Sequence, residues 1–419
     1  MRFVLLECDI VRTVVIGNQK DGRQHMDNRN VLEPGKLAIA LDMQWGSSGK
    51  GKLIGAIANK EHPDFAISHN SVNASHWYVA DDGFSYKFQQ LPTSIVCPTT
   101  KAIIGSGAVI SLPQLLKEIK DWNLDDERLV IHPNAVVITQ NDIDYERKEL
   151  MRIASTMTGG GSALGRKIMR HPETKLASHC EELKPFLDDT YGLAIEMLRE
   201  GKTGLLEIPQ GFDLSIDHGM THNTNDSVST AYPFVTSRNC DPNTFLGMSG
   251  IPFTFVNNVV LNMRTFPIRV GDSSNNKIDG YSGLELKGSY AGGMYVDQKE
   301  LTWDEITKIS NSFTPIKEMT SLTKRVRRVF SFSMMQLYNI TRTVQPTALS
   351  INFVNYLDAT ISGAKGEMSI VELDREYPKV SGFVMDVLRN QYWNHSLHKA
   401  DVWYLGTGPK NSEYIELTY

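Results

Sequence analysis

A segment rich in glycine and lysine, residues 46–52, is the stretch of the sequence whose residue types best suit chemistry. It reads GSSGKGK and lies between an apolar run, LAIALDM, and a helical pattern, KLIGAIANK. Glycines let the backbone turn its N–H groups toward an anion, and the start of the following helix adds partial positive charge. Lys50 and Lys52 can reach phosphate oxygens. The segment therefore predicts a nucleotide-phosphate site, with a glycine-rich turn bearing solvated lysines as the alternative.

The same segment departs from the standard phosphate-loop pattern in either register. Reading through Gly46 and Lys52 puts Leu53 where a hydroxyl belongs, and reading through Lys50 puts Gln44 where a glycine is needed. We therefore interpret it as an imperfect phosphate loop.

The elements that must position this segment are typical of an α/β protein. An apolar strand, a glycine-rich turn and a helix form the opening unit of a parallel sheet, with the ligand at the carboxyl end of the strand. We expect a central, largely parallel β-sheet flanked by helices. Further strands are predicted at KAIIGSGAVI, RLVIHPNAVVI, ALSINFVNYLD and WYLGTGPKN, helices at LPQLLKEIKDW and DYERKELMRIAS, and a long ligand-facing loop at residues 221–250.

Composition limits the partners of the chain. Its 43 Lys+Arg and 48 Asp+Glu residues leave a net charge of -5, so nucleic acid is not an expected partner. No window is apolar enough for a membrane span or an export signal. The four cysteines (Cys8, Cys97, Cys180 and Cys240) are too scattered for a disulfide framework. We expect a cytoplasmic protein, in the host cytoplasm if the chain is encoded by a phage.

The chain is expected to contain one large domain. Residues 1–35 end in a polar stretch without a helical or strand period, and we treat them as an N-terminal extension of uncertain role. The fold proper is expected over residues 36–419.

Several short segments, taken in order along the chain, are similar to those of a known enzyme family. They are QWGSSGKGK, NASH at 73–76, IGSG at 104–107, STMTGGGSALGRKIMR at 155–170, the block that includes QG, IDHG and YPFVTS between 210 and 237, RVG at 269–271, LTKRVRR at 322–328 and GTGP at 406–409. Together they resemble adenylosuccinate synthetase over roughly residues 37–419. The resemblance implies that family's phosphate-loop-related α/β fold.

The resemblance also implies a reaction. That family activates the 6-oxo group of a purine nucleotide by phosphoryl transfer from a nucleoside triphosphate, after which the amine of L-aspartate displaces phosphate. Such chemistry needs a base at purine N1, an acid and Mg2+ near the phosphoryl group, and cationic contacts to anionic substrates. His76 aligns with the catalytic acid, and Ser47 occupies the place of the catalytic aspartate. Ser47 and Ser75 would contact Mg2+.

Binding residues carry over from the matching segments. Arg170 resembles an arginine delivered by a neighbouring subunit, so a homodimer is implied. Three sets of residues are expected to bind the substrates. They are Ser47, Asn73, Thr156, Arg170, Gln210, Thr236 and Val270 for the purine nucleotide; Thr323, Arg325 and Arg327 for aspartate; and Gly49, Lys50, Gly51, Lys52, Asn355, Gly408 and Pro409 for the nucleoside triphosphate.

One departure from the family concerns the purine. The family's catalytic aspartate is Ser47 here, and its neighbouring glutamate is Ser48. A serine hydroxyl cannot act as a base at neutral pH, and the change leaves room beside purine N1 and C2. Guanine differs from hypoxanthine by an amino group at C2. The pattern therefore resembles the bacteriophage branch of the family, which acts on dGMP toward diaminopurine DNA. Asp42, a water molecule or the phosphoryl oxygens are the alternatives for removing the N1 proton.

A second departure concerns the phosphate donor. The family recognises a guanine nucleotide with a Thr-Lys-x-Asp element, which here reads Asn352-Phe353-Val354-Asn355. An amide offers a donor as well as an acceptor, so selectivity for guanine should be lost. We expect ATP or dATP as the donor.

The sequence thus predicts a ligase that joins L-aspartate to C6 of dGMP with hydrolysis of ATP or dATP. The product would be N6-succino-2-amino-2'-deoxyadenylate, and Mg2+ the cofactor. Two alternatives stay open: a standard adenylosuccinate synthetase acting on IMP, and a catalytically inactive nucleotide-binding homologue.

Overall fold

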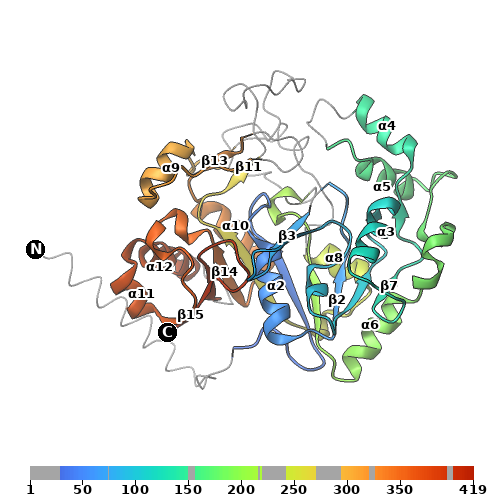
Figure 1. The fold of residues 1–419 in the computed structure, drawn as a ribbon, viewed down its shortest axis with the longest axis horizontal. Coiled ribbons are helices and arrows are strands. Elements are labelled where there is room, and N and C mark those ends of the chain that lie inside the picture. The colour runs from blue at the N-terminus through green and yellow to red at the C-terminus, as the bar shows by residue number, and fades with distance from the viewer. Residues whose placement is uncertain are drawn as a thin grey trace, which may run out of the picture.

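A ten-stranded sheet runs through the middle of the protein (Figure 1). The computed structural model describes residues 29–73, 75–149, 156–215, 218, 242–269, 294–319, 326–393 and 400–419. The strand order is β15-β17-β16-β14-β10-β1-β9-β2-β5-β7, and every neighbouring pair is parallel except β16 and β17. The predicted α/β fold with a largely parallel central sheet is confirmed.

The strands and helices of the described residues have the following bounds. The strands are β1 (Leu37–Asp42), β2 (Phe65–Ser68), β3 (His76–Val79), β4 (Ser85–Phe88), β5 (Lys101–Ile104), β6 (Val109–Ile110), β7 (Leu129–Ile131), β8 (Val136–Val137), β9 (Gly204–Glu207), β10 (Val256–Arg264), β11 (Ile268–Arg269), β12 (Glu300–Leu301), β13 (Arg328–Phe330), β14 (Ala348–Asn352), β15 (Gly366–Ser369), β16 (Asp401–Gly406) and β17 (Tyr414–Thr418). The helices are α2 (Lys50–Glu61), α3 (Leu112–Asp121), α4 (Gln140–Glu149), α5 (Gly160–Ile168), α6 (Thr190–Arg199), α8 (Pro242–Ser249), α9 (Trp303–Ser310), α10 (Met334–Val344), α11 (Ile370–Glu376) and α12 (Pro378–Trp393).

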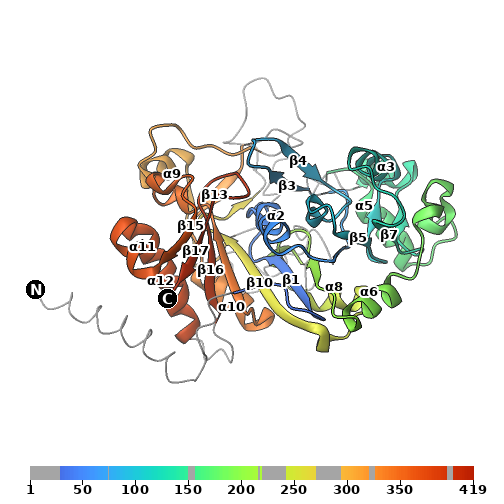
Figure 2. The same cartoon turned by 60° about the horizontal axis from the view of Figure 1, so that its bottom comes forward.

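The two halves of the chain lie on opposite sides of the sheet's centre. Strands β2, β5 and β7 with helices α3, α5 and α6 lie on one side, and β14 to β17 with α11 and α12 lie on the other (Figure 2). Between them, β1 pairs with β10 in parallel, so a strand near residue 40 adjoins one near residue 260. Segments that are distant in the sequence therefore meet at the middle of the sheet.

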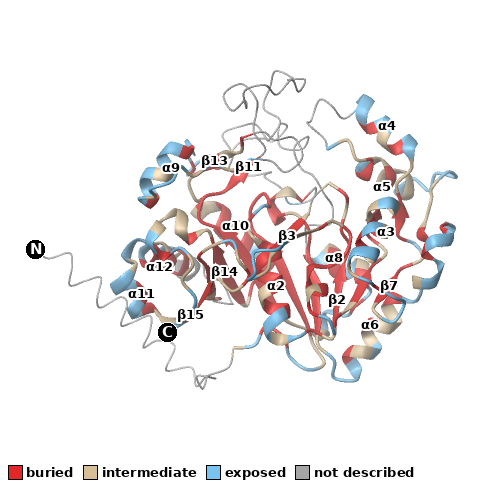
Figure 3. Cartoon of the chain, viewed as in Figure 1, coloured by how far each residue is buried: buried red, intermediate tan, exposed pale blue. Residues whose placement is uncertain are grey.

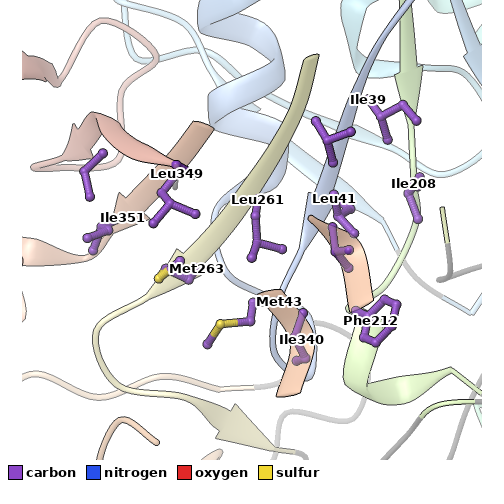
Figure 4. Close-up of a cluster of buried hydrophobic side chains, with 14 of the residues drawn as sticks. Ile39, Leu41, Met43, Ile208, Phe212, Leu261, Met263, Ile340, Leu349 and Ile351 are labelled. Atoms are coloured by element: carbon purple, nitrogen blue, oxygen red, sulfur yellow. The ribbon is translucent and has the colours of Figure 1, made fainter. Parts of the chain in front are cut away.

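Strand β1 is buried on both faces, as is typical of a parallel sheet covered by helices. Ala38 and Ala40 pack with residues of α2, whereas Ile39 and Leu41 face the larger cluster that includes α10 and α12. Figure 4 shows part of that larger cluster, where Leu41 and Leu261 lie near Ile340 of α10. The inner strands of the ten-stranded sheet are buried along most of their length, whereas the edge strand β15, the outer helices and the loops carry exposed residues (Figure 3). The sheet is therefore a rigid base for residues at its edge.

Several predicted elements differ in detail from the structure. The strands predicted at KAIIGSGAVI and RLVIHPNAVVI are each two strands, β5 and β6, then β7 and β8, because a turn interrupts each segment. Helix α4 begins at Gln140, earlier than predicted. The loop predicted over 221–250 is wrong at its end, because α8 occupies Pro242–Ser249; a proline fits the first turn of a helix, and Phe245 and Leu246 bury against the core. Residues 219–241 lie outside the described residues.

Part of the predicted N-terminal extension packs on the fold. Val31 and Leu32 are buried, and their backbone N–H groups donate to the carboxylate of Glu61 on α2.

Among the described helices, none combines the length and the apolar character that a membrane span requires.

Candidate active site

The polar residues of the candidate site lie where parallel strands end. Asp42 closes β1, Glu207 closes β9, Arg264 closes β10 and Asn352 closes β14. The register pairs Asp42 with Asn262, and Arg264 with Asn352. Ligands of open α/β sheets bind outside the carboxyl ends of the strands, and this edge carries buried polar groups from four adjacent strands.

The loop between β1 and α2 has the backbone of an anion site. Gly46, Ser47 and Gly49 have positive φ angles of 79°, 52° and 84°. Such turns aim successive N–H groups into one concavity, and the following helix adds its positive end. A left-handed serine costs about 1 kcal/mol, which marks Ser47 as a strained residue of the loop. Gln44 docks the loop on β10 because its side-chain amide exchanges hydrogen bonds of 2.9 Å with the backbone of Arg264.

Lys50, at the start of α2, is held by one group from β1 and one from the loop after β9. Its Nζ donates to Asp42 Oδ2 at 3.2 Å and to the Gln210 carbonyl at 2.7 Å. Asn262 donates from Nδ2 to Asp42 Oδ1 at 2.6 Å and to the Ser48 carbonyl at 3.0 Å. Both carboxylate oxygens of Asp42 therefore have partners. Lys50 and Gln210, two of the predicted site residues, are thus in contact, through the Gln210 backbone rather than its side-chain amide.

The network continues to the C-terminal strand. Asn352 Nδ2 donates to Asn262 Oδ1 at 2.6 Å, and Tyr414 Oη donates to Asn352 Oδ1 at 2.9 Å. A Cβ on Gly49 would lie 3.1 Å from the Asn352 side chain, so a small residue is needed there. These buried hydrogen bonds join β1, β10, β14 and β17 below the phosphate loop.

The side chains of Lys52 and Lys50 bind different parts of the protein. Its Nζ donates to the carbonyls of Gly408 and Glu413 at 2.6 and 2.7 Å and lies 3.9 Å from the centre of the Tyr414 ring. Burial lowers the pKa of Lys52 to about 7, and Glu413 opposes this lowering. In this structure Lys52 binds the Gly408–Pro409 turn, which was predicted to contact the nucleoside triphosphate.

His76 begins β3, which crosses the first turn of α2. A Cβ on Gly51 would lie 2.5 Å from the Trp77 carbonyl, so glycine is required for this close approach. His76 Nδ1 lies 3.4 Å from Thr93 Oγ1 and 3.9 Å from Glu207 Oε2. Burial lowers the pKa of His76, the nearby Glu207 carboxylate raises it, and the charge of Lys50 lowers it further. The net effect favours the neutral imidazole in the unliganded site.

A small pocket lies beside His76. It is lined by Asn70, Ser71, Ser75, His76, Phe88 and Pro209. Within the same region, Asn73 Oδ1 is buried without a hydrogen-bond partner. Ser75 and His76 thus line the pocket, and the neighbouring Asn73 has a buried oxygen without a partner that a ligand can fill.

The residues predicted to contact Mg2+ do not make a magnesium site by themselves. Mg2+ is usually bound through one or two carboxylates together with substrate phosphates. Ser47 and Ser75 supply only neutral hydroxyls, Ser48 Oγ is buried without a partner, and the Asp42 carboxylate is committed to Lys50 and Asn262. In the part of the chain that the structure describes, no three His, Cys, Asp or Glu side chains are grouped to hold a metal.

The start of α5 is already occupied by a carboxylate. Glu146 accepts hydrogen bonds from the N–H groups of Gly159 and Gly161 at 2.8 and 2.7 Å. These two N–H groups are therefore not free to bind a nucleotide phosphate in this structure. Thr156 is exposed at its start, and Arg170, with a positive φ of 55°, is exposed beyond its end.

Of the remaining predicted site residues, the structure describes Asn355 and Arg327. Asn355 is half-buried in the short 3-10 helix Val354–Tyr356 that follows β14. Arg327 lies beside Glu318, to whose carbonyl its backbone N–H donates at 2.9 Å. Thr236, Val270, Thr323 and Arg325 lie outside the described residues.

Sequence reasoning missed Asn262, Arg264 and Glu318. Arg264 is fully buried, its Nη2 donates to Glu318 Oε1 at 2.5 Å and its Nη1 donates to the Ser47 carbonyl at 2.8 Å. A signal was present in β10, because Asn262 and Arg264 alternate with apolar residues at the carboxyl end of a buried strand.

The comparisons with known proteins agree with this geometry. A family model described as adenylosuccinate synthetase matches residues 39–175, which include the phosphate loop and His76. Two proteins named N6-succino-2-amino-2'-deoxyadenylate synthase, from Acinetobacter phage SH-Ab 15497 and Vibrio phage phiVC8, are 32% and 33% identical to this chain. These alignments cover 77% and 76% of this chain and 84% and 86% of the phage proteins. The chain belongs to the adenylosuccinate synthetase family.

A solved structure extends the likeness to three dimensions. The succinoaminodeoxyadenylate synthetase of cyanophage S-2L, bound to dGMP and to dATP as an energy donor, matches with a TM-score of 0.71 and 27% identity. The match covers 91% of this chain and 95% of that one. The predicted family, its bacteriophage branch and the prediction of a ligase that forms a C–N bond are confirmed. The roles of individual site residues stay predictions.

Proposed function

We propose that this chain joins the amino group of L-aspartate to C6 of dGMP. The donor is ATP or dATP, and the products are N6-succino-2-amino-2'-deoxyadenylate, phosphate and a nucleoside diphosphate. The observation that carries the proposal is Ser47, an exposed, short and neutral residue in the loop between β1 and α2. The phage relatives named for this reaction, and the S-2L structure with dGMP, support it.

The first half of the reaction is phosphoryl transfer to O6 of the purine. The N–H groups of the loop, the start of α2 and Lys50 form a cationic cradle for the transferring phosphate. Asp42 balances the charge of Lys50 while no phosphate is bound. The arrangement therefore needs little rearrangement when the triphosphate enters.

His76 supplies the acid in this scheme. Burial and Lys50 favour its neutral form in the unliganded site, whereas Glu207 favours the charged form. A phosphorylated O6 adds negative charge beside the ring and raises the pKa of His76 again. His76 then stabilises the oxygen on which charge develops.

The second half is attack by aspartate at C6. Thr323, Arg325 and Arg327 are our candidates for binding its carboxylates, since a guanidinium matches a carboxylate with two parallel hydrogen bonds. Arg327 supports this proposal: its backbone N–H donates to the Glu318 carbonyl, and the Glu318 carboxylate binds Arg264, which donates to the Ser47 carbonyl of the phosphate loop.

Asn355 and the Gly408–Pro409 turn are our candidates for the base of the donor. Asn355 follows β14, and Lys52 holds the turn after β16. An adenine nucleotide fits Asn355 better than a guanine nucleotide, and the S-2L relative is bound to dATP as an energy donor. Mg2+ would enter with the triphosphate, whose oxygens supply the ligands that these side chains lack.

We further propose that the enzyme is a homodimer in which Arg170 reaches the partner's dGMP. Arg170 is exposed at the end of α5, and the neighbouring Ile168 and Met169 are also exposed, as is Tyr145 on α4. Adjacent exposed apolar side chains are typical of a surface that another subunit covers.

The test compares two purine nucleotides in the wild type and in Ser47→Asp. With aspartate, Mg2+ and dATP, the wild type should convert dGMP faster than IMP. In the Ser47→Asp variant, turnover of dGMP should fall by a factor at least about ten times larger than the factor by which turnover of IMP falls. The reason is that the larger, charged carboxylate would occupy the space that the 2-amino group of guanine needs. A wild type that prefers IMP would favour a standard adenylosuccinate synthetase. No turnover of either nucleotide would favour an inactive homologue.

A further inference from the structure

The guanidinium of Arg264 joins two parts of the candidate site that bind different substrates. We infer that Arg264 and Glu318 are a positioning pair, which holds the aspartate-binding Arg327 in register with the phosphate loop at Ser47. The inference rests on the proposed function, because it takes Arg327 as part of the aspartate site. Neither Arg264 nor Glu318 is expected to touch a substrate.

The guanidinium of Arg264 contacts Ser47 in the phosphate loop, the Glu318 carboxylate and the Phe353 ring. Nη1 donates to the Ser47 carbonyl at 2.8 Å and to Glu318 Oε2 at 3.3 Å, and Nη2 donates to Glu318 Oε1 at 2.5 Å. The guanidinium carbon lies 4.0 Å from the centre of the Phe353 ring. Phe353 belongs to the segment that leads to Asn355. One side chain therefore contacts the strained residue of the phosphate loop, the segment before Arg327 and the segment of the donor site.

Glu318 carries the connection onward to Arg327. Its carbonyl accepts the Arg327 N–H at 2.9 Å, and Arg327 Nε donates to the Met319 carbonyl at 3.3 Å. Tyr356 Oη donates to Glu318 Oε1 at 3.1 Å. Burial raises the pKa of Glu318, but the charges of Arg264 and Arg327 and the hydrogen bonds hold it below its usual value. The carboxylate is thus an anion that is bound by Arg264 and stabilised by the charge of Arg327.

Stability alone does not account for this pair. Arg264 is 0% exposed and its Nε is buried without a hydrogen-bond partner. Taking a charge out of water is costly, and replacing a buried ion pair by apolar residues is often neutral or stabilising. A planar fork with fixed angles, in contrast, defines the distance between the two groups that it binds. Its place at the end of β10, on the rigid sheet, makes Arg264 suited to set the positions of both loops.

The kinetic test uses variants that keep charge or shape. Arg264→Lys keeps the charge but loses the fork, and Glu318→Gln keeps the shape but loses the charge. Each should raise the KM for aspartate about tenfold, with the KM for the purine nucleotide changed less than about threefold. The double variant should match either single variant, because both remove one connection. Aspartate KM is measured with whichever purine nucleotide the wild type converts, so a preference for IMP leaves this test intact.

Arg328→Lys is the matched control. Arg328 adjoins Arg327 in sequence and makes the same two-point contact, with Glu300, through bonds of 2.8 and 2.6 Å. That pair joins β13 to β12, and in the described part of the chain Arg328 makes no hydrogen bond with Ser47 or Glu318. Its loss should therefore leave the aspartate KM within about twofold of the wild type. Equal effects of Arg264→Lys and Arg328→Lys would overturn the inference.

A second measurement does not depend on turnover. Hydrogen exchange of the unliganded Arg264→Lys protein should become faster in peptides that cover residues 44–49 and 316–319, with exchange of α2 and β14 unchanged. Unchanged exchange in both peptides would overturn the inference even if the aspartate KM rises. Faster exchange over the whole sheet would also overturn it, since the pair would then be purely structural.

Discussion

Lys50 Nζ lies 3.2 Å from Asp42 Oδ2, and both side chains are almost fully buried. The second oxygen of Asp42 accepts a hydrogen bond of 2.6 Å from Asn262. Asp42 was one of three alternatives for the base at purine N1. A carboxylate with both oxygens engaged inside the protein is better suited to balancing the charge of Lys50, so the geometry favours water or a phosphoryl oxygen as the base.

Replacing Asp42 tests this assignment. Asp42→Asn should lower the free energy of unfolding by about 3 kcal/mol, because it leaves the Lys50 ammonium buried without its counterion. The acid side of the pH profile of kcat should keep its shape, measured by steady-state rates between pH 5 and 8. If that side of the profile flattens while the protein stays as stable as the wild type, Asp42 is the base.

His76→Asn should separate catalysis from folding. Loss of the acid should lower kcat by about 100-fold or more, whereas His179→Asn, at an exposed position, should leave kcat unchanged. Retained kcat with a large drop in Tm would make His76 a structural residue.

The same His76 variant makes a prediction about pH. Burial and Lys50 hold the pKa of His76 below the usual 6.5, so below this pH the unfolded chain binds more protons than the folded protein. The wild type should therefore lose more stability than His76→Asn as the pH falls from 7 to 5. Equal losses in melting experiments would contradict the buried neutral imidazole.

Lys52 should make stability depend on pH above neutrality. Burial lowers its pKa to about 7, while the unfolded chain keeps a value near 10.5. Between these values the unfolded state binds more protons, so the free energy of unfolding rises with pH. The Tm of the wild type minus that of Lys52→Met should increase from pH 7 to 9. Lys60→Met, on the exposed side of the same helix, is the control and should show no such trend; a flat difference for Lys52→Met would contradict the prediction.

Asn355 should decide between adenine and guanine donors. The wild type should use GTP at least about tenfold less efficiently than ATP or dATP, since guanine N1–H and N2–H would lack a carboxylate acceptor. Asn355→Asp should narrow or reverse that difference in kcat/KM. A wild-type preference for GTP would mean that Asn352-Phe353-Val354-Asn355 is not the donor element.

The sequence by itself determined the features that depend on neighbouring residues. An apolar run followed by three glycines and two lysines, all within residues 37–52, predicts a strand, an anion-binding turn and a helix. The structure has β1, the left-handed turns at Gly46 and Gly49, and α2 in that order. The family followed from contiguous segments for the same reason. Local backbone preferences and short motifs are encoded by adjacent residues, so they can be read without the fold.

Only the tertiary structure decided where the long side chains of the site point. Lys50 and Lys52 look equivalent in sequence, yet Lys50 binds Asp42 whereas Lys52 binds the carbonyl of Gly408, 356 positions away. The sequence did not predict a role for Arg264. Its partners, Ser47 and Glu318, belong to segments that meet only when β10 pairs between β1 and β14. The order and register of the strands set these contacts, and they depend on how the whole core packs rather than on any one stretch of residues.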